Sequence, residues 1–194
     1  PIDEIAGTAV DRFAYGFGVG PTMFHDTKVG EIWGTRFEKM PNAVDWRAYE
    51  NIMTLINRGY DPLKVIIDRT HEKGLEFFGS LRMTHSSDPK LTESTHNWQF
   101  KIDHPEWCLK GPGKHCFNWV HPEVRAERFA LIEETLNRYD IDGFEVDLTF
   151  DPSYFEPDEI EQNRHILTDF MRDVRRASND AASKCGRSIA LGAR

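Results

Sequence analysis

The positions of apolar residues predict four amphipathic helices separated by short strands. In each helical segment, apolar side chains recur every three or four residues, which places them on one face of a helix. Asp61 and Pro62 predict the start of one helix, as its N-cap and first helical residue, and Gly74 predicts its end. The predicted helices are 45–58, 63–73, one that begins at Pro122 and one that begins at Pro157.

Five short runs of β-forming residues lie between and after these helices, at 12–19, 74–83, 115–120, 143–150 and 188–194. The alternation of strands and helices is typical of parallel βα units. Two long connections, 20–44 and 84–114, follow the carboxyl ends of strands, where active-site loops lie in α/β barrels. The sequence therefore predicts an α/β fold of the (β/α)8 TIM-barrel type, in a single domain over residues 1–194.

The number of strands is too small for a closed barrel. A complete barrel of this type has eight βα units in about 250 residues. The 194 residues of this chain supply only about five strands. We therefore expect the chain to form the first five or so units of an incomplete barrel, and part of the catalytic machinery to lie outside it.

The predicted strand 143–150, with the sequence GFEVDLTF, carries acidic residues on one face only. Its even-numbered residues are apolar, whereas Glu145, Asp147 and Thr149 share the other face. In a parallel sheet covered by helices, the apolar face packs under the helices and the other face points into the barrel. A carboxylate enclosed there is costly to desolvate unless it belongs to a polar site. Asp147 and Glu145 are therefore the candidate catalytic residues, and the alternative is an exposed edge strand.

Further candidates lie at or beyond the ends of the predicted strands. Arg82, at the exit of the strand 74–83, is expected to pair with Asp147 and hold it ionised, or else to form a purely structural ion pair. Sugars present apolar ring faces and hydroxyl groups, so sugar-binding sites combine aromatic rings with short polar groups. The candidate substrate-binding residues are Arg82, His85, Asn118, Trp119 and Asp151.

Several segments resemble the bacterial glycoside-hydrolase-like (β/α)8 barrel proteins. RYDIDGFEVDL is similar to their fourth strand, and THEKGLEFFGSLRM is similar to their second unit. HPEWCLKGPGKHCFNWVHPEVR resembles the stretch that joins the two, and HDTKVGEIWG an insertion found in a subset. The resemblance covers most of residues 45–150. It implies a TIM barrel whose catalytic or transition-state-stabilising carboxylate is Asp147, and it favours an exported protein.

Two related motifs fit only in part. The chitinase-type pattern DGxDxDxE has its acidic residue where this chain has Thr149, which disfavours substrate-assisted chemistry. The amylase-type pattern GFRxD places its nucleophile at Asp147 and an arginine at Glu145. Glycosidases commonly use two carboxyl groups, about 5 Å apart in retaining enzymes. Glu145 lies about 7 Å deeper along the strand than Asp147, so we expect it to support the site rather than to attack the sugar.

Charge and cysteine content narrow the class of partner. The net charge of −8, from 24 basic and 32 acidic residues, argues against binding to nucleic acids or to anionic membranes. No apolar run approaches the roughly 20 residues that span a bilayer, and no cofactor is predicted. Cys108 and Cys116 flank a Gly-Pro-Gly turn and form either a disulfide or two free thiols.

The predicted function is that of a carbohydrate-active hydrolase, and two alternatives remain. In the first, His85, His115 and Asp147 converge on a metal ion of a metal-dependent hydrolase. In the second, a degenerate barrel binds glycans without cleaving them. The presence of Thr149, where chitinase-type relatives carry their acid, favours this second alternative.

Overall fold

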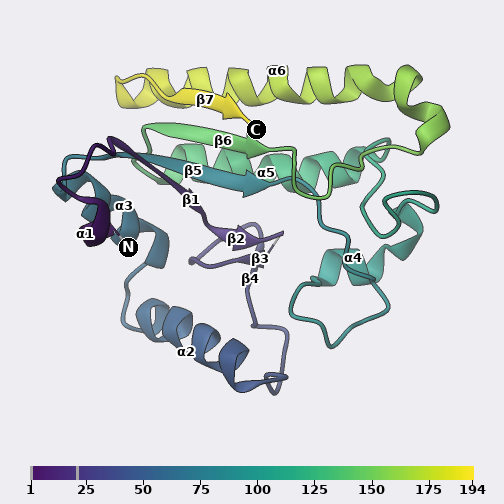
Figure 1. Ribbon diagram of the computed structural model, residues 1–194, viewed down its shortest axis with the longest axis horizontal. Helices are drawn as coiled ribbons and strands as arrows, with labels where there is room; N and C mark the ends of the chain where they lie inside the picture. The colour runs from purple at the N-terminus through teal and green to yellow at the C-terminus, as the bar shows by residue number, and fades with distance from the viewer. Residues whose placement is uncertain (1, 21) are drawn as a thin grey trace.

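The centre of the molecule is a parallel sheet in the order β1-β5-β6-β7 (Figure 1). The computed structural model describes residues 2–20 and 22–194, so Pro21, in the connection 20–44, lies outside the described residues. Each strand pairs in parallel with its neighbour. The strands of this sheet are β1 (Arg12–Gly16), β5 (Glu76–Arg82), β6 (Gly143–Asp147) and β7 (Ala190–Ala193).

Two helices begin at the predicted prolines, Pro62 and Pro122, whereas Pro157 begins a short 3-10 helix and the α-helix after it begins at Ile160. The side chain of Asp61 accepts a hydrogen bond from the backbone N–H of Leu63, and Pro62 is the first helical residue. Gly74 follows the same helix with a φ of 73°, a left-handed conformation that suits glycine. The α-helices are α1 (Ile2–Ile5), α2 (Ala43–Asn57), α3 (Pro62–Glu72), α4 (Gln99–Asp103), α5 (Pro122–Arg138) and α6 (Ile160–Cys185), and the 3-10 helices are η1 (Pro105–Trp107) and η2 (Pro157–Glu159).

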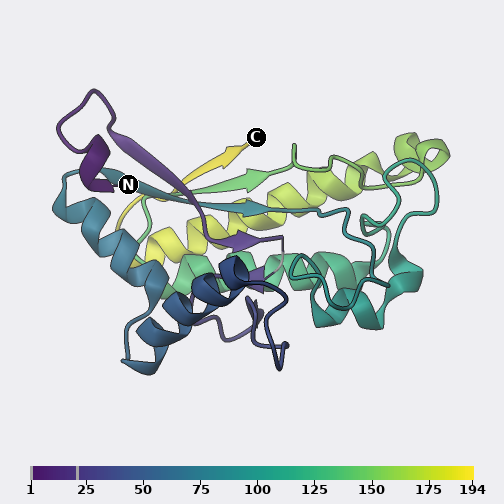
Figure 2. The ribbon, with the colours of Figure 1, turned by 60° about the horizontal axis from the view of Figure 1, so that its bottom comes forward.

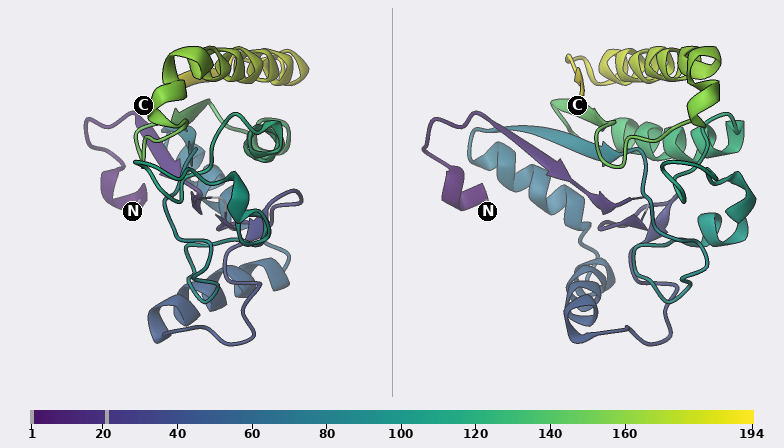
Figure 3. Two further views of the ribbon diagram at one scale, coloured as in Figure 1. Left: turned by 90° about the vertical axis from the view of Figure 1, so that its right-hand side faces the viewer. Right: turned by 45° about the vertical axis from the view of Figure 1, so that its right-hand side comes forward.

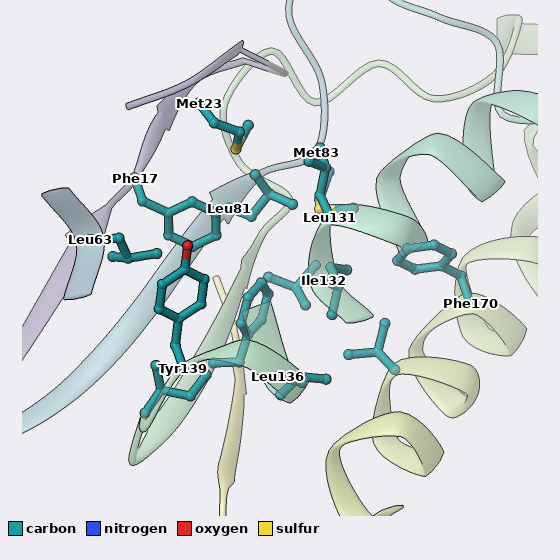
Figure 4. Packing of buried hydrophobic residues seen from close by; sticks show 14 of the residues in the cluster. Phe17, Met23, Leu63, Leu81, Met83, Leu131, Ile132, Leu136, Tyr139 and Phe170 are labelled. Atoms are coloured by element: carbon teal, nitrogen blue, oxygen red, sulfur yellow. The ribbon is translucent and has the colours of Figure 1, made fainter. Parts of the chain in front are cut away.

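Helices α2 to α6 lie on one side of the sheet, as the view in Figure 2 shows. The apolar face of β6 packs toward them, because Phe144 and Val146 are completely buried. Figure 4 shows this core, in which Leu81 of β5 lies between Phe17 and residues of α5 such as Leu131 and Ile132. The prediction that the even-numbered residues of β6 pack under the helices is therefore confirmed, and the other face of the sheet carries Glu145 and Asp147.

A second, smaller sheet lies at the end of β1 and consists of β2 (Gly18–Val19), β3 (Thr22–Met23) and β4 (Glu31–Ile32). The predicted strand 12–19 is thus divided at Phe17, whose buried ring contacts His25 and Phe144. Helix α2 lies beside α3 and extends away from the main sheet (Figure 3). Among the described residues, no helix has the length and apolar character needed to cross a membrane.

The prediction of a strand at 115–120 is wrong. This segment is irregular, and its only ladder contact within the described residues is an isolated antiparallel bridge between Cys108 and Phe117. Its β-forming residues are explained by burial, because Cys116, Phe117 and Trp119 belong to the buried core. Strand β5 pairs directly with β6 instead. Within the described residues, the main sheet therefore has four parallel strands rather than the five predicted.

Cys108 and Cys116 are free thiols. In the antiparallel bridge, Cys108 lies opposite Phe117, and the backbone N–H of Leu109 donates to the carbonyl of Cys116. Of the two alternatives that the sequence leaves open, the structure therefore has the pair of free thiols.

His25 is a buried and neutral residue of the core. Its ring is 1% exposed, lies edge-on to Phe17 and Tyr139, and has no hydrogen-bond partner for either nitrogen among the described residues. Burial lowers the pKa of His25 below its ordinary value of 6.5, although the carboxylates of Asp61 and Glu134 act in the opposite direction. Protonation of this ring would therefore place a charge in the core, where burial opposes it.

We expect the free energy of unfolding to fall as the pH is lowered below about 6.5. The folded state then binds fewer protons at His25 than the unfolded state, so this stabilisation is complete above pH 6.5 and is lost as the pH falls toward the lower pKa of the folded state. Urea unfolding at several pH values measures the slope. The His25→Phe variant should show a smaller slope, and a His165→Gln control on the exposed face of α6 should not. An unchanged slope in His25→Phe would contradict this account.

Candidate functional site

The polar side chains of β5 and β6 meet on the face of the sheet that is turned away from the helices. The register places Ser80 beside Glu145 and Arg82 beside Asp147. Gly143, one pair deeper, leaves room for the ring of Phe78, which lies 2.2 Å from the position that a Cβ atom would occupy there. This face of the sheet therefore carries the aromatic ring of Phe78 toward the amino-terminal ends of the strands and ionisable groups at their carboxyl ends.

Asp147 is the most firmly held carboxylate of this face. Its Oδ1 accepts hydrogen bonds from the backbone N–H (3.1 Å) and the hydroxyl (2.8 Å) of Thr149, and its Oδ2 accepts one from the Arg194 guanidinium at 2.6 Å. Burial of the carboxyl group opposes ionisation, but the hydrogen bonds from Arg194 and Thr149 outweigh it, so the pKa of Asp147 is lowered. Asp147 is therefore an ionised acceptor at neutral pH.

Glu145 lies one layer deeper and has a supporting position. Its Oε1 accepts a hydrogen bond from the Ser80 hydroxyl at 2.7 Å and lies 3.8 Å from Nε of Arg194. The guanidinium of Arg194 thus contacts both carboxylates of β6. This arrangement couples the orientation of Asp147 to that of Glu145 through a single cation.

The expected ion pair between Arg82 and Asp147 is replaced by a different contact. Arg82 neighbours Asp147 in the register, but its guanidinium lies 4.0 Å from the centre of the Phe150 ring. The cation that pairs with Asp147 is Arg194, from the adjacent strand end. Arg82 is thus at the carboxyl ends of the strands, as predicted, in a cation–π contact rather than in the predicted ion pair.

His85 lies next to this group and is a neutral hydrogen-bond donor. Its ring contacts Phe150 and stacks on His96, and its Nδ1 accepts a hydrogen bond from the backbone N–H of Ser87. The proton of the neutral ring is therefore on Nε2. Burial, with the nearby charge of Lys101, lowers the pKa of His85 to about 4.

Asn118 and Trp119 lie in the irregular segment before α5. The amide oxygen of Asn118 accepts a hydrogen bond from the backbone N–H of Val120, and its side chain is half-buried. Trp119 is completely buried between Tyr154 and Phe170. The prediction that Trp119 contacts a substrate is therefore not supported, because its ring has no accessible face. Asn118 stays a prediction.

Two residues of this site were missed by sequence reasoning. Ser80 and Arg194 hold the two carboxylates; Ser80 has the inward parity on β5, and Arg194 directly follows β7. The parity of Ser80 was visible in the sequence. Arg194 is 47 positions from Asp147, and only the strand order β6-β7 brings them together. No sequence pattern within β6 indicates that contact.

The described residues contain no group of three or more His, Cys, Asp or Glu side chains that could hold a metal ion. His115 pairs with Asp88 at 3.6 Å, and Asp147 is engaged by Arg194 and Thr149. The alternative in which His85, His115 and Asp147 converge on a metal is therefore wrong for this arrangement of side chains.

We expect Thr149→Val to raise the pKa of Asp147 toward its ordinary value, because it removes the hydroxyl that donates to Oδ1. Thr149→Ser keeps a hydroxyl and should keep the pKa low. The loss of one hydrogen bond to a charged group should also lower the free energy of unfolding, by about 1.5–3 kcal/mol. An NMR titration of the Asp147 carboxyl carbon, with Thr8→Val as a remote control, measures the pKa. Equal titration curves for wild type and Thr149→Val would refute the expectation.

Comparison with known protein families identifies the family of this chain. The profile of the family described as "Glycosyl hydrolase-like 10" matches residues 32–168. The chain belongs to this family. The match includes β5, β6 and the loops at their carboxyl ends, so Asp147, Glu145 and Thr149 lie within the shared part of the sequence, whereas Arg194 lies outside it.

Two curated relatives of this chain are also named as glycosyl hydrolases. Glycosyl hydrolase YngK of Bacillus subtilis is 32% identical over 112 residues, which are 55% of this chain and 21% of that protein. Glycosyl hydrolase DigH of Escherichia coli K12 is 25% identical over 100 residues, which are 47% of this chain and 23% of that protein. The chain thus matches between a fifth and a quarter of the length of these relatives.

Solved structures of glycosidases share the fold. The galactosidase domain of the alpha-galactosidase-sucrose kinase AgaSK superposes with a TM-score of 0.54 and 18% identity, over 99% of this chain and 23% of that chain. Alpha-L-fucosidase isoenzyme 2 from Paenibacillus thiaminolyticus superposes with a TM-score of 0.50 and 14% identity, over 94% of this chain and 26% of that chain. The four parallel strands and their helices are therefore a part of a TIM barrel, as the sequence predicts.

Proposed function

We propose that this chain supplies a catalytic carboxylate, Asp147, to a glycoside hydrolase that cleaves the glycosidic bonds of an oligo- or polysaccharide. The observation that carries the proposal is the position of Asp147 at the carboxyl end of β6, where active sites of TIM barrels lie. Three hydrogen bonds from Thr149 and Arg194 keep it ionised and oriented. Membership of a glycosyl hydrolase-like family agrees with this chemistry.

An ionised carboxylate has two uses in glycoside hydrolysis. It attacks the anomeric carbon in a retaining enzyme, or it stabilises the positive charge of the oxocarbenium-like transition state. Both uses need a group that is unprotonated at neutral pH, and the lowered pKa of Asp147 provides it. The general acid has the opposite requirement, a raised pKa. Asp147 does not meet it, so the acid is a separate carboxyl group.

The neighbours of Asp147 have roles that follow from their contacts. Glu145, bound to Ser80 and close to Arg194, holds the guanidinium that orients Asp147. Arg82 and the neutral His85 supply donors beside the aromatic ring of Phe150. Such a combination of donors with an aromatic ring suits the hydroxyl groups and apolar faces of a sugar.

A second candidate function is glycan binding without cleavage. The observation that favours it is Thr149, whose exposed side chain occupies the position of the chitinase-type acid and bonds to Asp147. A site without a proton donor would bind a glycan and leave it intact.

One experiment separates the two functions. The purified full chain is incubated with a panel of nitrophenyl glycosides and soluble polysaccharides, and released reducing ends are measured alongside affinity electrophoresis on the same polysaccharides. Release of reducing ends above that of a heat-denatured sample supports hydrolysis. Retarded migration without release supports the binding function. The absence of both would contradict either function.

A further inference from the structure

Two non-glycine residues in the described part of the chain have a left-handed backbone, His115 with a φ of 75° and Asp151 with a φ of 48°. A side chain with a Cβ atom makes this conformation unfavourable, although aspartate tolerates it better than most residues. Such residues persist where their surroundings fix them, and they concentrate at functional sites. The two lie near each other, because Sγ of Cys116 donates to the carbonyl of Asp151 at 3.7 Å.

The segments that follow β5 and β6 hold Asp151 in place. The backbone N–H of Met83 donates to the carbonyl of Asp147 at 3.1 Å, so the parallel pairing continues past the strand ends. The hydroxyl of Thr84 donates to the carbonyl of Asp151 at 2.7 Å, and the backbone N–H of Ser86 donates to its Oδ2 at 2.9 Å. These contacts fix the carboxylate of Asp151 beyond the end of β6, beside the segment that carries His85.

Only part of the Asp151 carboxylate is used by these contacts. Its Oδ1 has no hydrogen-bond partner among the described residues, and the side chain is half-buried. Glycine would adopt the left-handed backbone with less strain, and asparagine would still accept the hydrogen bond from Ser86. What aspartate alone adds at this position is a negative charge and a second acceptor oxygen.

We propose that Asp151 binds the sugar, with its carboxylate accepting hydrogen bonds from hydroxyl groups of the ring that is bound beside Asp147. The inference rests on the proposed function and adds a specificity-determining residue to it. The N–H of Ser86 holds the carboxylate and the hydroxyl of Thr84 holds the backbone of the same residue, so the carboxylate accepts from hydroxyl donors without first losing side-chain freedom. A sugar that lacks the contacted hydroxyl leaves that carboxylate oxygen without a hydrogen-bond donor, which lowers its affinity.

The test is the coupling between a variant of Asp151 and the removal of a sugar hydroxyl. The probes are the methyl glycosides of glucose, galactose, mannose and N-acetylglucosamine, together with the monodeoxy analogues of the one that binds most tightly. Calorimetric titration of the full chain gives each Kd. In wild type, one or two deoxy analogues should bind roughly 10- to 100-fold more weakly. In Asp151→Asn and Asp151→Gly, the parent glycoside should lose a similar factor, and the same deoxygenation should add little.

Two controls distinguish a sugar-binding role of Asp151 from a purely structural role in its turn. His115→Gly relieves the other left-handed residue and should leave every Kd unchanged, and thermal melts show whether the variants fold. Kd values for both Asp151 variants within twofold of wild type would overturn the inference. So would equal effects of deoxygenation in wild type and variants, or a folded wild type that binds none of the probes. The release of reducing ends is measured separately, so hydrolysis can fail while the coupling holds, and the reverse.

Discussion

Asp147→Asn is expected to lower kcat/KM for glycoside hydrolysis by roughly a thousandfold or more, the range found when a group that acts directly in the chemical step is removed. The substitution keeps the size of the side chain and removes its charge. An amide oxygen can still accept from Thr149, but the amide nitrogen then faces the Arg194 guanidinium, which is also a donor. Both the charge that the reaction needs and the contact that orients it are lost.

Two matched variants show whether the loss is chemical. Glu145→Gln keeps an acceptor for the Ser80 hydroxyl and should lower kcat/KM by about tenfold, because it acts only through Arg194. Asp140→Asn, whose side chain is 71% exposed before the start of β6, should have no effect. Thermal melts check that each variant is folded. A folded Asp147→Asn variant with wild-type turnover would remove Asp147 from the mechanism.

A rescue experiment distinguishes the two uses of the carboxylate. In Asp147→Gly, sodium azide supplies a small external nucleophile to an activated nitrophenyl glycoside. If Asp147 is the nucleophile of a retaining enzyme, azide restores release of nitrophenol and yields a glycosyl azide of inverted configuration relative to the substrate. If Asp147 stabilises charge without attacking, azide does not restore the reaction.

The sequence was informative wherever a structural choice depends on neighbouring residues. The N-cap Asp61 with Pro62 marks the start of α3, because the first backbone N–H groups of a helix need an acceptor that only a nearby side chain supplies. The alternation along β6 assigns Phe144 to the helix side and Asp147 to the opposite face, because the period of a strand is two. These features follow from local geometry, and all of them are present in the structure.

The features that sequence reasoning missed depend on contacts between distant segments. Arg194 reaches Asp147 because β7 pairs with β6, and strand order is a property of the whole sheet. The segment 115–120 looks like a strand because it is rich in β-forming apolar residues, but it packs against the core without joining the main sheet. A short apolar run indicates burial, and burial is common to strands and to loops that are covered by helices.

Trp119→Ala is expected to lower the free energy of unfolding by about 3–5 kcal/mol, the range for large aromatic residues removed from a core. The indole is completely buried and makes edge-to-face contacts with Tyr154 and Phe170, at centroid distances of 5.2 and 5.0 Å. It thereby joins the loop after β6 to the middle of α6. Urea unfolding followed by circular dichroism measures the loss, and the exposed Trp46→Ala on α2 should change it by less than about 0.5 kcal/mol.

Trp119→Phe separates packing from polarity at the same position. The buried Nε1 of Trp119 has no hydrogen-bond partner among the described residues, so an unsatisfied donor already opposes the packing of this ring. Phenylalanine removes that donor and keeps an aromatic edge for Tyr154 and Phe170. We therefore expect it to lose less than half of what alanine loses. If Trp119→Ala instead melted like Trp46→Ala but no longer bound glycans, the indole would be a sugar platform and the enclosed core position would be wrong. The order of these three unfolding energies thus decides whether residue 119 serves the fold or the substrate.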